Sequence, residues 1–201
     1  MSPEEIAKIN WTKQNDLVPA IVQDAANHRV LMLGFMNRDA LETTISTGRV
    51  TFWSRSKGRL WTKGETSGHF LEFVRAETDC DRDALLIVAR PDGPTCHLNR
   101  ASCFETAPSD FLSDLDRLIE RRERERPAGS YTTRLFEAGV KRIAQKVGEE
   151  GVEAALAGVG ENDEKLLGEA ADLIYHLAVL LRSRGLGLDE AVDVLRKRHL
   201  K

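Results

Sequence analysis

The sequence predicts two domains, an N-terminal β-rich (α+β) domain and a C-terminal all-α helical bundle. Between Leu17 and Phe104, short apolar runs alternate with turns rich in Gly, Pro, Asn and charged residues, which is typical of strands. After Phe104 the apolar residues recur at intervals of three and four, the spacing of an amphipathic helix. We therefore expect three segments, namely residues 1–108, a helical linker over 109–129, and residues 130–201.

Strands and a single helix are expected in the first domain. The predicted strands cover residues 18–23, 30–36, 50–54, 70–74 and 84–89. The first two flank the polar turn at Asn27-His28, which indicates a β-hairpin. A helix is expected over residues 38–47, because Asn37 is a suitable N-cap and Gly48 a suitable stop.

The rest of the chain is predicted to be helical. A first helix follows Ser109 as its N-cap, and its end at residues 121–126 carries charges of both signs, which favours solvent exposure over a binding patch. Further helices are expected over residues 132–144, 146–157, 164–182 and 189–198. Glycines at 158–160 and at 185–187 separate the last three of them.

Composition excludes several classes of function. The 201 residues carry a net charge of −3, without the clustered basic excess that binding to duplex nucleic acid requires. No stretch approaches the ~18 apolar residues of a membrane span, and the start lacks a basic region followed by an apolar core. The three cysteines, an odd number, argue against a disulfide framework and favour thiol chemistry or a metal. We expect a cytoplasmic protein with no nucleic-acid or membrane partner.

An acidic segment stands ahead of the last predicted strand. In it Asp79, Asp81 and Asp83 alternate with Cys80 and Arg82, so in an extended chain the three carboxylates share one face and the thiol points to the other. Like charges on one face repel unless a hard cation lies among them, and oxygen ligands suit Mg²⁺ or Ca²⁺. An EF-hand loop is excluded, because Ala and Arg stand where its turn glycine and bidentate glutamate are required. The alternative is an acidic surface turn.

The cysteines form a second candidate metal site. Cys80, Cys96 and Cys103 are suitable Zn²⁺ ligands, and three protein ligands leave a fourth position for water, as in catalytic sites. The alternatives are a closed structural site with His97 as fourth ligand, or buried inert thiols. Since Cys80 points away from its flanking aspartates, either the strand bulges there or the thiol and the carboxylates serve separate sites. We favour the second option, with Cys96 and Cys103 arriving from a second subunit.

Two pairs of carboxylates lie in the predicted helices. Glu150 and Glu153 are three residues apart, as are Glu169 and Asp172, so each pair lies on one helical face. Carboxylates beside an apolar, core-facing stripe are costly unless a cation pairs with them. Antiparallel packing would join the pairs into a Mg²⁺ cage able to hold a triphosphate. The alternative is two solvated surface pairs.

The first domain resembles phosphoribosyl-AMP cyclohydrolase. The segments "VLMLGFMNRDAL", "FWSRSKGRLWTKGETSGH", "DCDRDALL" and "GPTCHLNRASCF" carry the resemblance over nearly all of residues 17–104. It implies a homodimer with active sites at the subunit interface, zinc on the three cysteines, magnesium on the three aspartates, and hydrolytic opening of the purine ring of phosphoribosyl-AMP. His97 is the predicted proton carrier, because imidazole titrates near neutrality. Asn99 departs from the glycine of many family members, although Asn tolerates left-handed backbone angles.

A basic segment offers candidate phosphate ligands. We single out Arg55, Lys63 and Ser67 in "SRSKGRLWTKGETSGH", with possible help from backbone amides of neighbouring glycines. The spacing matches no fixed phosphate loop, so the alternative is a basic surface hairpin. His69 receives no role.

The second domain resembles phosphoribosyl-ATP pyrophosphatase, a helical relative of the MazG-type nucleotide pyrophosphohydrolases. "SYTTRLFEAGVKRIAQKVGEEGVEAAL" and "GEAADLIYHLAVLL" carry the resemblance over residues 130–199. It implies that the four helical carboxylates named above bind Mg²⁺, and that such helices also dimerise. The candidate phosphate contacts are Lys141, Arg142 and Lys146, whereas Glu149 has no assigned role.

Together the two resemblances predict a bifunctional hydrolase of histidine biosynthesis. The second domain would convert phosphoribosyl-ATP into phosphoribosyl-AMP and pyrophosphate, and the first would then open the adenine ring. One alternative is a general nucleotide pyrophosphohydrolase fused to an inactive zinc-binding domain. Another is a zinc-stabilised adaptor with a helical dimerisation module.

Overall fold

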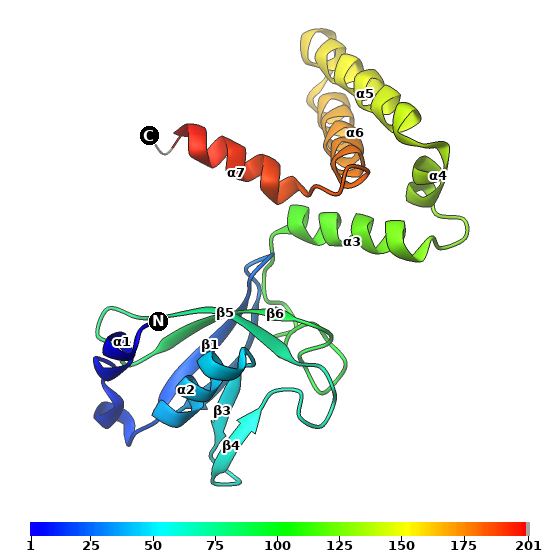
Figure 1. The fold of residues 1–201 in the computed structure, drawn as a ribbon. Helices are drawn as coiled ribbons and strands as arrows, with labels where there is room; N and C mark the ends of the chain where they lie inside the picture. Colours follow the sequence, from blue (N-terminus) through cyan, green and yellow to red (C-terminus); the bar gives the residue numbers. More distant parts are fainter. Residues whose placement is uncertain (200–201) are drawn as a thin grey trace. The chain divides into compact units, whose positions relative to one another are not determined.

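The computed structural model describes residues 1–199 and divides into two compact units, Met1–Asp110 and a second one that begins at Phe111 (Figure 1). The first unit is strand-rich and the second is helical, so the predicted fold class is confirmed. Within the segment expected as a helical linker, residues 109–129, the chain forms the helix Phe111–Glu125, which packs with the second unit because its Ile119 is completely buried in the helical core.

The first unit contains a four-stranded sheet and a separate two-stranded hairpin. Its elements are α1 (Pro3–Ala7), a 3₁₀ helix (Trp11–Gln14), β1 (Val18–Asp24), β2 (Val30–Met36), α2 (Arg38–Thr47), β3 (Thr51–Ser54), β4 (Arg59–Thr62), β5 (Leu71–Thr78) and β6 (Leu85–Pro91). The four-stranded sheet has the order β2-β1-β6-β5, in which β1 and β6 are parallel and the other neighbours antiparallel. Strands β3 and β4 form the hairpin. The sequence did not predict α1, the 3₁₀ helix or β4.

Local chemistry explains the elements that were predicted. Asn37 caps α2 by accepting a hydrogen bond from the Ala40 amide at 2.9 Å, and Gly48 ends the helix with a left-handed φ of 70°. In β2, a Cβ atom at Gly34 would lie 2.3 Å from the Phe52 ring. Glycine is therefore needed there for the ring to pack against the strand.

The topology of the sheet gives it two chemically different ends. Because β1 and β6 run in parallel, the start of β1 lies beside the turn at residues 79–84 that joins β5 to β6. The end of β6, the start of β5 and the start of β2 lie at the opposite end. Strand β6 spans seven residues, so the two ends are separated by about 20 Å.

The second unit consists of five described helices. These are α3 (Phe111–Glu125), α4 (Tyr131–Ala138), α5 (Val140–Gly160), α6 (Asp163–Arg182) and α7 (Leu188–His199). The core contains Ile119, Leu135, Ile143, Ala178 and Val179. Helices α5 and α6 lie side by side (Figure 1) and are joined by two residues, so they run antiparallel. Among residues 1–199, no helix has both the length and the apolar character of a membrane span.

Three predicted helix boundaries were wrong. The chain breaks at Gly139, where φ is 83°, so residues 140–160 form one continuous helix and no boundary occurs near residue 145. The glycines at 158–160 stay helical, and α6 starts behind Asn162, which accepts from the Lys165 amide at 2.9 Å. Helix α3 begins at Phe111, whereas the hydroxyl of Ser109 accepts from the Arg29 guanidinium at 2.6 Å.

Candidate active sites

The acidic segment of the first unit is a turn and not an extended strand. Asp79 Oδ1 accepts hydrogen bonds from the backbone amides of Asp83 at 3.0 Å and Ala84 at 3.1 Å, and Arg82 has a φ of 60°. The predicted alternation of faces was therefore wrong, because side chain to backbone bonding replaces the strand geometry. The turn nevertheless gathers Asp79, Asp81 and Asp83, whose oxygens lie within 4.8 Å of one another and form a possible metal-binding group.

A lysine from the N-terminal segment already supplies positive charge to this turn. Lys13 Nζ lies 2.7 Å from Asp81 Oδ2 and also contacts Asp83 Oδ2. The hydrogen bond from Lys13 lowers the pKa of Asp81. Two of the three aspartates are thus arranged around the ammonium group of Lys13. Sequence reasoning missed Lys13, because it lies 68 residues away from Asp81 along the chain.

The cysteines separate into two groups within one chain. Cys96 and Cys103 line the same cavity, and desolvation and then the neighbouring Cys96 thiol raise the pKa of Cys103. The Cys103 amide donates to the Leu31 carbonyl at 2.8 Å, which fixes this thiol beside the start of β2. Exposed Cys80 lies in the β5–β6 turn at the opposite end of the sheet. A bulge at Cys80 would not close the separation of about 20 Å, so one chain does not bring the three thiols together.

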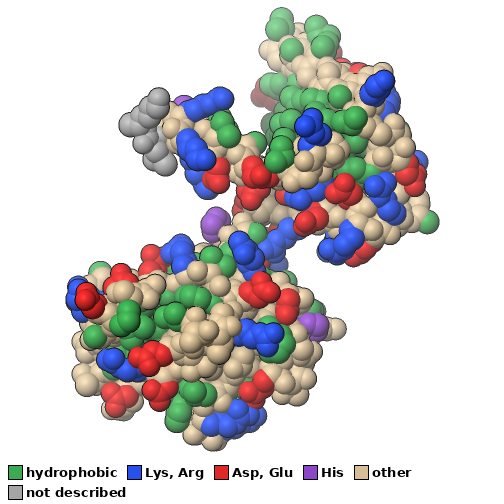
Figure 2. Space-filling view, in the orientation of Figure 1, with side chains coloured by type: hydrophobic (Ala, Val, Ile, Leu, Met, Phe, Trp, Pro, Cys, Tyr) green, Lys and Arg blue, Asp and Glu red, His purple; other side chains and the backbone are tan. Residues whose placement is uncertain are grey.

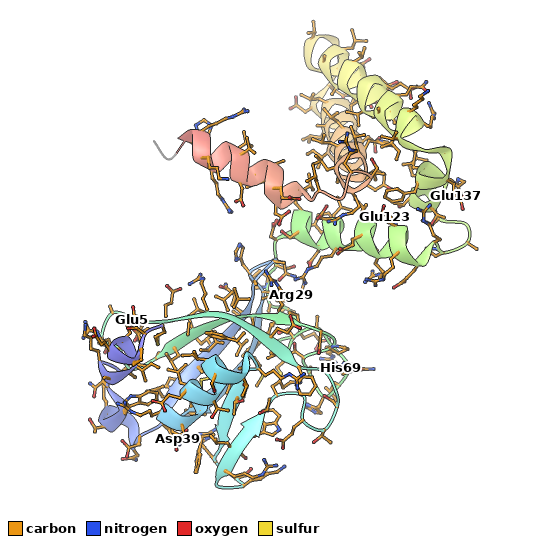
Figure 3. All side chains as sticks on the ribbon, viewed as in Figure 1. Glu5, Arg29, Asp39, His69, Glu123 and Glu137 are labelled. Carbon is orange, nitrogen blue, oxygen red and sulfur yellow. The ribbon has the colours of Figure 1, made fainter. Side chains whose placement is uncertain are left out.

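Cys96 and Cys103 line a cavity of about 400 Å³ together with several predicted site residues. Among its other lining residues are His97, Lys63, Ser67, Thr95, Asn99 and His69. Asn99 has a φ of 62°, which confirms that it adopts the left-handed angle expected in place of glycine. Figure 3 labels His69, whose ring packs against Gly93, 2.2 Å from the position a Cβ atom would take there.

Two buried polar groups in this cavity lack strong partners. Lys63 is 8% exposed, and its ammonium donates to the His69 carbonyl at a long 3.4 Å. Thr95 is 3% exposed, and its hydroxyl has no hydrogen-bond partner among the described residues. Buried donors without partners are costly, so the cavity is suited to a polar or anionic ligand. Sequence reasoning missed Thr95, although it directly precedes Cys96.

Arg55 lies elsewhere. Its guanidinium stacks on the Phe35 ring at 3.8 Å and lines a different cavity of about 350 Å³. The structure therefore brings Lys63 and Ser67 together but not Arg55 with them. The basic segment contains the β3–β4 hairpin connection, as the surface-hairpin alternative proposed. Trp61 lines both cavities, so they are adjacent.

The second unit assembles its carboxylates within one chain. Oxygens of Glu150, Glu169 and Asp172 lie within 4.8 Å of one another, and the two glutamates are buried. Glu153 stands at the edge of this group. Desolvation and then the charges of Glu169 and Glu150 raise its pKa. The helical spacing predicted this cluster, which we call the helical carboxylate cluster.

Lysines four residues upstream accompany both buried glutamates. Lys146 Nζ contacts Glu150 Oε1 and lies 3.0 Å from Glu149, and Lys165 Nζ contacts Glu169 Oε1. The hydrogen bond from Lys146 lowers the pKa of Glu150. These i,i+4 pairs keep the buried charges compensated. Lys165 was not predicted as part of this group, although its i,i+4 spacing from Glu169 was a usable signal.

The other two predicted phosphate contacts, Arg142 and Lys141, do not contact the helical carboxylate cluster directly within residues 1–199. Arg142 Nη1 lies 3.2 Å from Glu149 Oε1, so it reaches the cluster only through that glutamate. Lys141 is exposed, and no contact of its side chain with the helical carboxylate cluster is observed in the described residues. One further residue was missed. His176 is buried beside the cluster, with its Nδ1 atom 3.7 Å from Glu150 Oε1.

Comparisons with known proteins agree with this division. Residues 32–105 match the family model for phosphoribosyl-AMP cyclohydrolase, and residues 112–199 match that for phosphoribosyl-ATP pyrophosphohydrolase. The chain is 66% identical to the histidine biosynthesis bifunctional protein HisIE of Xanthomonas campestris, over 95% of this chain and 93% of the relative. The identity to HisIE of Yersinia pestis is 52% over the full length of both chains, and to HisIE of Salmonella typhimurium 51% over 99% of both.

Proposed function

The chain belongs to the HisIE family of bifunctional histidine-biosynthesis enzymes, and we propose that its two reactions use the two sets of metal-ligating residues described above. It is a hydrolase with a phosphoribosyl-ATP pyrophosphohydrolase domain and a phosphoribosyl-AMP cyclohydrolase domain. The main interpretation of the sequence is thus confirmed, and the inactive-fusion and adaptor alternatives are not supported. Hydrolysis of phosphoribosyl-ATP to the monophosphate supplies the substrate of the cyclohydrolase.

The helical carboxylate cluster suits Mg²⁺ and the first reaction. Three carboxylates in a small, partly buried volume repel one another, and the pKa of the adjacent Glu153 is raised first by desolvation and then by the charges of Glu169 and Glu150. When bound, Mg²⁺ neutralises the charge of the substrate phosphates. We assign Glu150, Glu169 and Asp172 as ligands, with Glu153 completing the set. A cation there would release Lys146 and Lys165 from their glutamates, which would leave both ammonium groups available to bind phosphate oxygens.

The cavity at the cysteines suits the second reaction. We assign His97 as the proton carrier, since its Nδ1 atom lies 3.9 Å from the Cys96 sulfur and its ring lines the cavity. Lys63 and Ser67 would bind an anionic part of phosphoribosyl-AMP, and the unpaired hydroxyl of Thr95 would contact the substrate as well. When bound to the thiolates, Zn²⁺ activates water at neutral pH. Thiolate ligands need a reducing compartment, which favours the cytoplasm.

One observation carries the proposal that this zinc site joins two chains. Cys80 lies at one end of the sheet and Cys96 and Cys103 lie at the other, so the three thiols meet only if Cys80 comes from a second copy. A two-fold dimer would complete two such sites at once. The aspartate turn, which we assign to a second Mg²⁺ ion, would approach the same interface because it contains Cys80.

The helical unit also offers a surface for a second copy. Figure 2 shows hydrophobic side chains gathered over α5 and α6. The exposed large hydrophobic residues of these helices include Val152, Leu156, Val159, Leu167, Ile174 and Leu177. A contiguous apolar surface of this kind is typical of an interface between subunits. We propose that this face supports the same homodimer.

Substrate turnover tests these assignments. Purified protein is given phosphoribosyl-ATP, and phosphoribosyl-AMP and the ring-opened product are both followed. We expect Cys96→Ala to stop at phosphoribosyl-AMP and Glu150→Ala to consume no substrate. Ring opening by Cys96→Ala, or pyrophosphate release by Glu150→Ala at the parental rate, would show that the corresponding site is assigned to the wrong residues.

A further inference from the structure

A buried hydrogen-bonded pair stands behind the helical carboxylate cluster. His176 is 4% exposed and lies one turn after Asp172 in α6. Its Nε2 atom is 2.9 Å from the hydroxyl of Tyr131, the first residue of α4, and its Nδ1 atom is 2.8 Å from the Asp172 backbone oxygen. The imidazole therefore connects α4 to the turn of α6 that carries a proposed Mg²⁺ ligand.

The partners fix the direction of these hydrogen bonds. A carbonyl oxygen only accepts, so Nδ1 of His176 carries the hydrogen and donates it to Asp172. In the neutral ring, Nε2 is then the acceptor and the Tyr131 hydroxyl donates to it. The ring is also held by packing, with edge contacts to Tyr131 at 5.9 Å and to Tyr175 at 5.2 Å between ring centroids. Its orientation is thus determined from both sides.

The oriented ring faces a carboxylate of the cluster. Its Nδ1–H edge lies 3.7 Å from Glu150 Oε1, the same oxygen that contacts Lys146. We propose that Tyr131 and His176 are positioning residues that hold Glu150 and the Asp172 turn in the geometry that binds the cation. This inference rests on the proposed Mg²⁺ site and assigns a function to two residues outside the ligand set. Partners of this kind behind metal ligands typically change metal affinity 10–100-fold when removed.

A neighbouring pair provides a matched control. The hydroxyl of Tyr175 lies 2.8 Å from Thr132 Oγ1 and so also joins α6 to α4, and Thr132 in turn accepts from Arg122 at 3.1 Å. The two tyrosine rings stack with centroids 6.2 Å apart. Tyr175→Phe therefore removes the same kind of interhelical hydrogen bond as Tyr131→Phe. Of these two tyrosines, Tyr131 is the one whose hydroxyl is bonded to the imidazole that faces Glu150.

Cation binding to the full-length chain tests the proposal directly. Mn²⁺ is used as the probe, with its free-ion electron paramagnetic resonance signal as the readout. The ions bound by the parent but not by Glu150→Gln are assigned to the helical carboxylate cluster. We expect Tyr131→Phe to weaken this binding about tenfold and His176→Leu by up to about a hundredfold. Tyr175→Phe should stay within about twofold of the parent.

A double-variant comparison separates positioning from general packing. In His176→Asn the amide can still donate towards the Asp172 carbonyl, but the Nε2 acceptor is gone. Adding Tyr131→Phe to His176→Asn should then cause no further loss of Mn²⁺ affinity, because the two residues act through one hydrogen bond. The Mg²⁺ concentration for half-maximal pyrophosphate release should rise in parallel, while ring opening of phosphoribosyl-AMP by the same chains stays unchanged.

Two results would overturn the proposal, and they are distinguishable. Equal losses in Tyr131→Phe and Tyr175→Phe, or additive losses in the double variant, would mean that the pair only packs helices together. Equal Mn²⁺ binding by the parent and Glu150→Gln would instead remove the metal site itself, and with it the reason for positioning residues.

Discussion

The carboxylates of the helical unit and the cysteines of the strand-rich unit reach their sites by different routes. Residues three apart on a helix share a face, and a two-residue connection folds α5 back along α6, so Glu150 and Glu169 meet within one chain. In the sheet, Cys80 and Cys96 lie beyond opposite ends of β6. A helical hairpin can therefore complete a site alone, whereas this sheet presents two halves that a second copy would bring together in the proposed zinc site.

Charge compensation differs in the same way. In the helical unit, each buried glutamate has a lysine four residues earlier in its own helix. In the strand-rich unit, the aspartate turn is paired with Lys13, which comes from the N-terminal segment. The first arrangement is local and accompanies helix formation. The second needs the N-terminal segment to be in place, which the hydrogen bond from the Asn10 amide to the Arg82 carbonyl at 2.8 Å supports.

The largest effect should come from removing one proposed ligand of the single-chain site. Because a bound cation contributes several kcal/mol of charge stabilisation, we expect Glu169→Gln to slow pyrophosphate release about a thousandfold. Ring opening of phosphoribosyl-AMP should not change. Glu137→Gln, an exposed change on α4 (labelled in Figure 3), is the control and should leave both rates at parental values. Loss of both activities in Glu169→Gln would mean that the two sites are not independent.

A core substitution should separate the units by stability. Ile119 of α3 is completely buried with Leu135 and Val179, so Ile119→Ala should lower the free energy of unfolding of the helical unit by about 3 kcal/mol. Denaturant unfolding followed by circular dichroism measures this, since the helical signal comes mainly from that unit. Phe111→Ala, on the same helix but 73% exposed, should change it by less than about 0.5 kcal/mol. Equal effects would indicate that α3 is a linker after all.

Local patterns predicted much of this molecule. Asn37 and Gly48 bound α2 as expected, and the i,i+3 spacing of the carboxylates predicted the helical carboxylate cluster. Such features depend on neighbours within one or two turns of chain. The boundary error at Gly139 has the same origin, because apolar periodicity continues across the glycine while its positive φ breaks the helix.

Features that depend on distant partners were not predicted. The aspartate segment was considered as an extended chain, with a surface turn as the alternative, and bonding of the Asp79 side chain to the following amides makes it a turn. Lys13 meets Asp81 across 68 residues, and Tyr131 meets His176 across 45. No periodicity encodes these pairs. Strand β4 was missed because its four residues, with charged Arg59 at the start, lack a strand-like apolar run.

Mixing two inactive variants should show whether the zinc site is shared. Cys80→Ala and Cys103→Ala chains should each lack ring-opening activity. After unfolding and refolding together with zinc, half of the dimers contain one chain of each kind and one intact site of two, so about a quarter of the parental rate should return. Mixing Cys96→Ala with Cys103→Ala is the control and should restore nothing. One chain must supply both of these thiols to a site, and neither variant has both. No recovery in the first mixture would contradict a shared site.

The smallest effect concerns the pH dependence of the single-chain site. The pKa of Glu153 is raised above its ordinary value of 4.5, first by desolvation and then by Glu169 and Glu150. The folded chain therefore binds this proton more tightly than the unfolded chain. Its stabilising effect is complete below pH 4.5 and is lost as the pH rises through the raised pKa.

Without added cation, the melting temperature of Glu153→Gln should therefore fall less than that of the parent as the pH rises through this window. Added Mg²⁺ should reverse the parental loss, because the cation then compensates the carboxylate charges that oppose ionisation of Glu153. Glu137→Gln should follow the parent at every pH. If Glu153→Gln also follows the parent with and without Mg²⁺, then Glu153 lies outside the cluster. The single-chain site would then depend on Glu150, Glu169 and Asp172 alone.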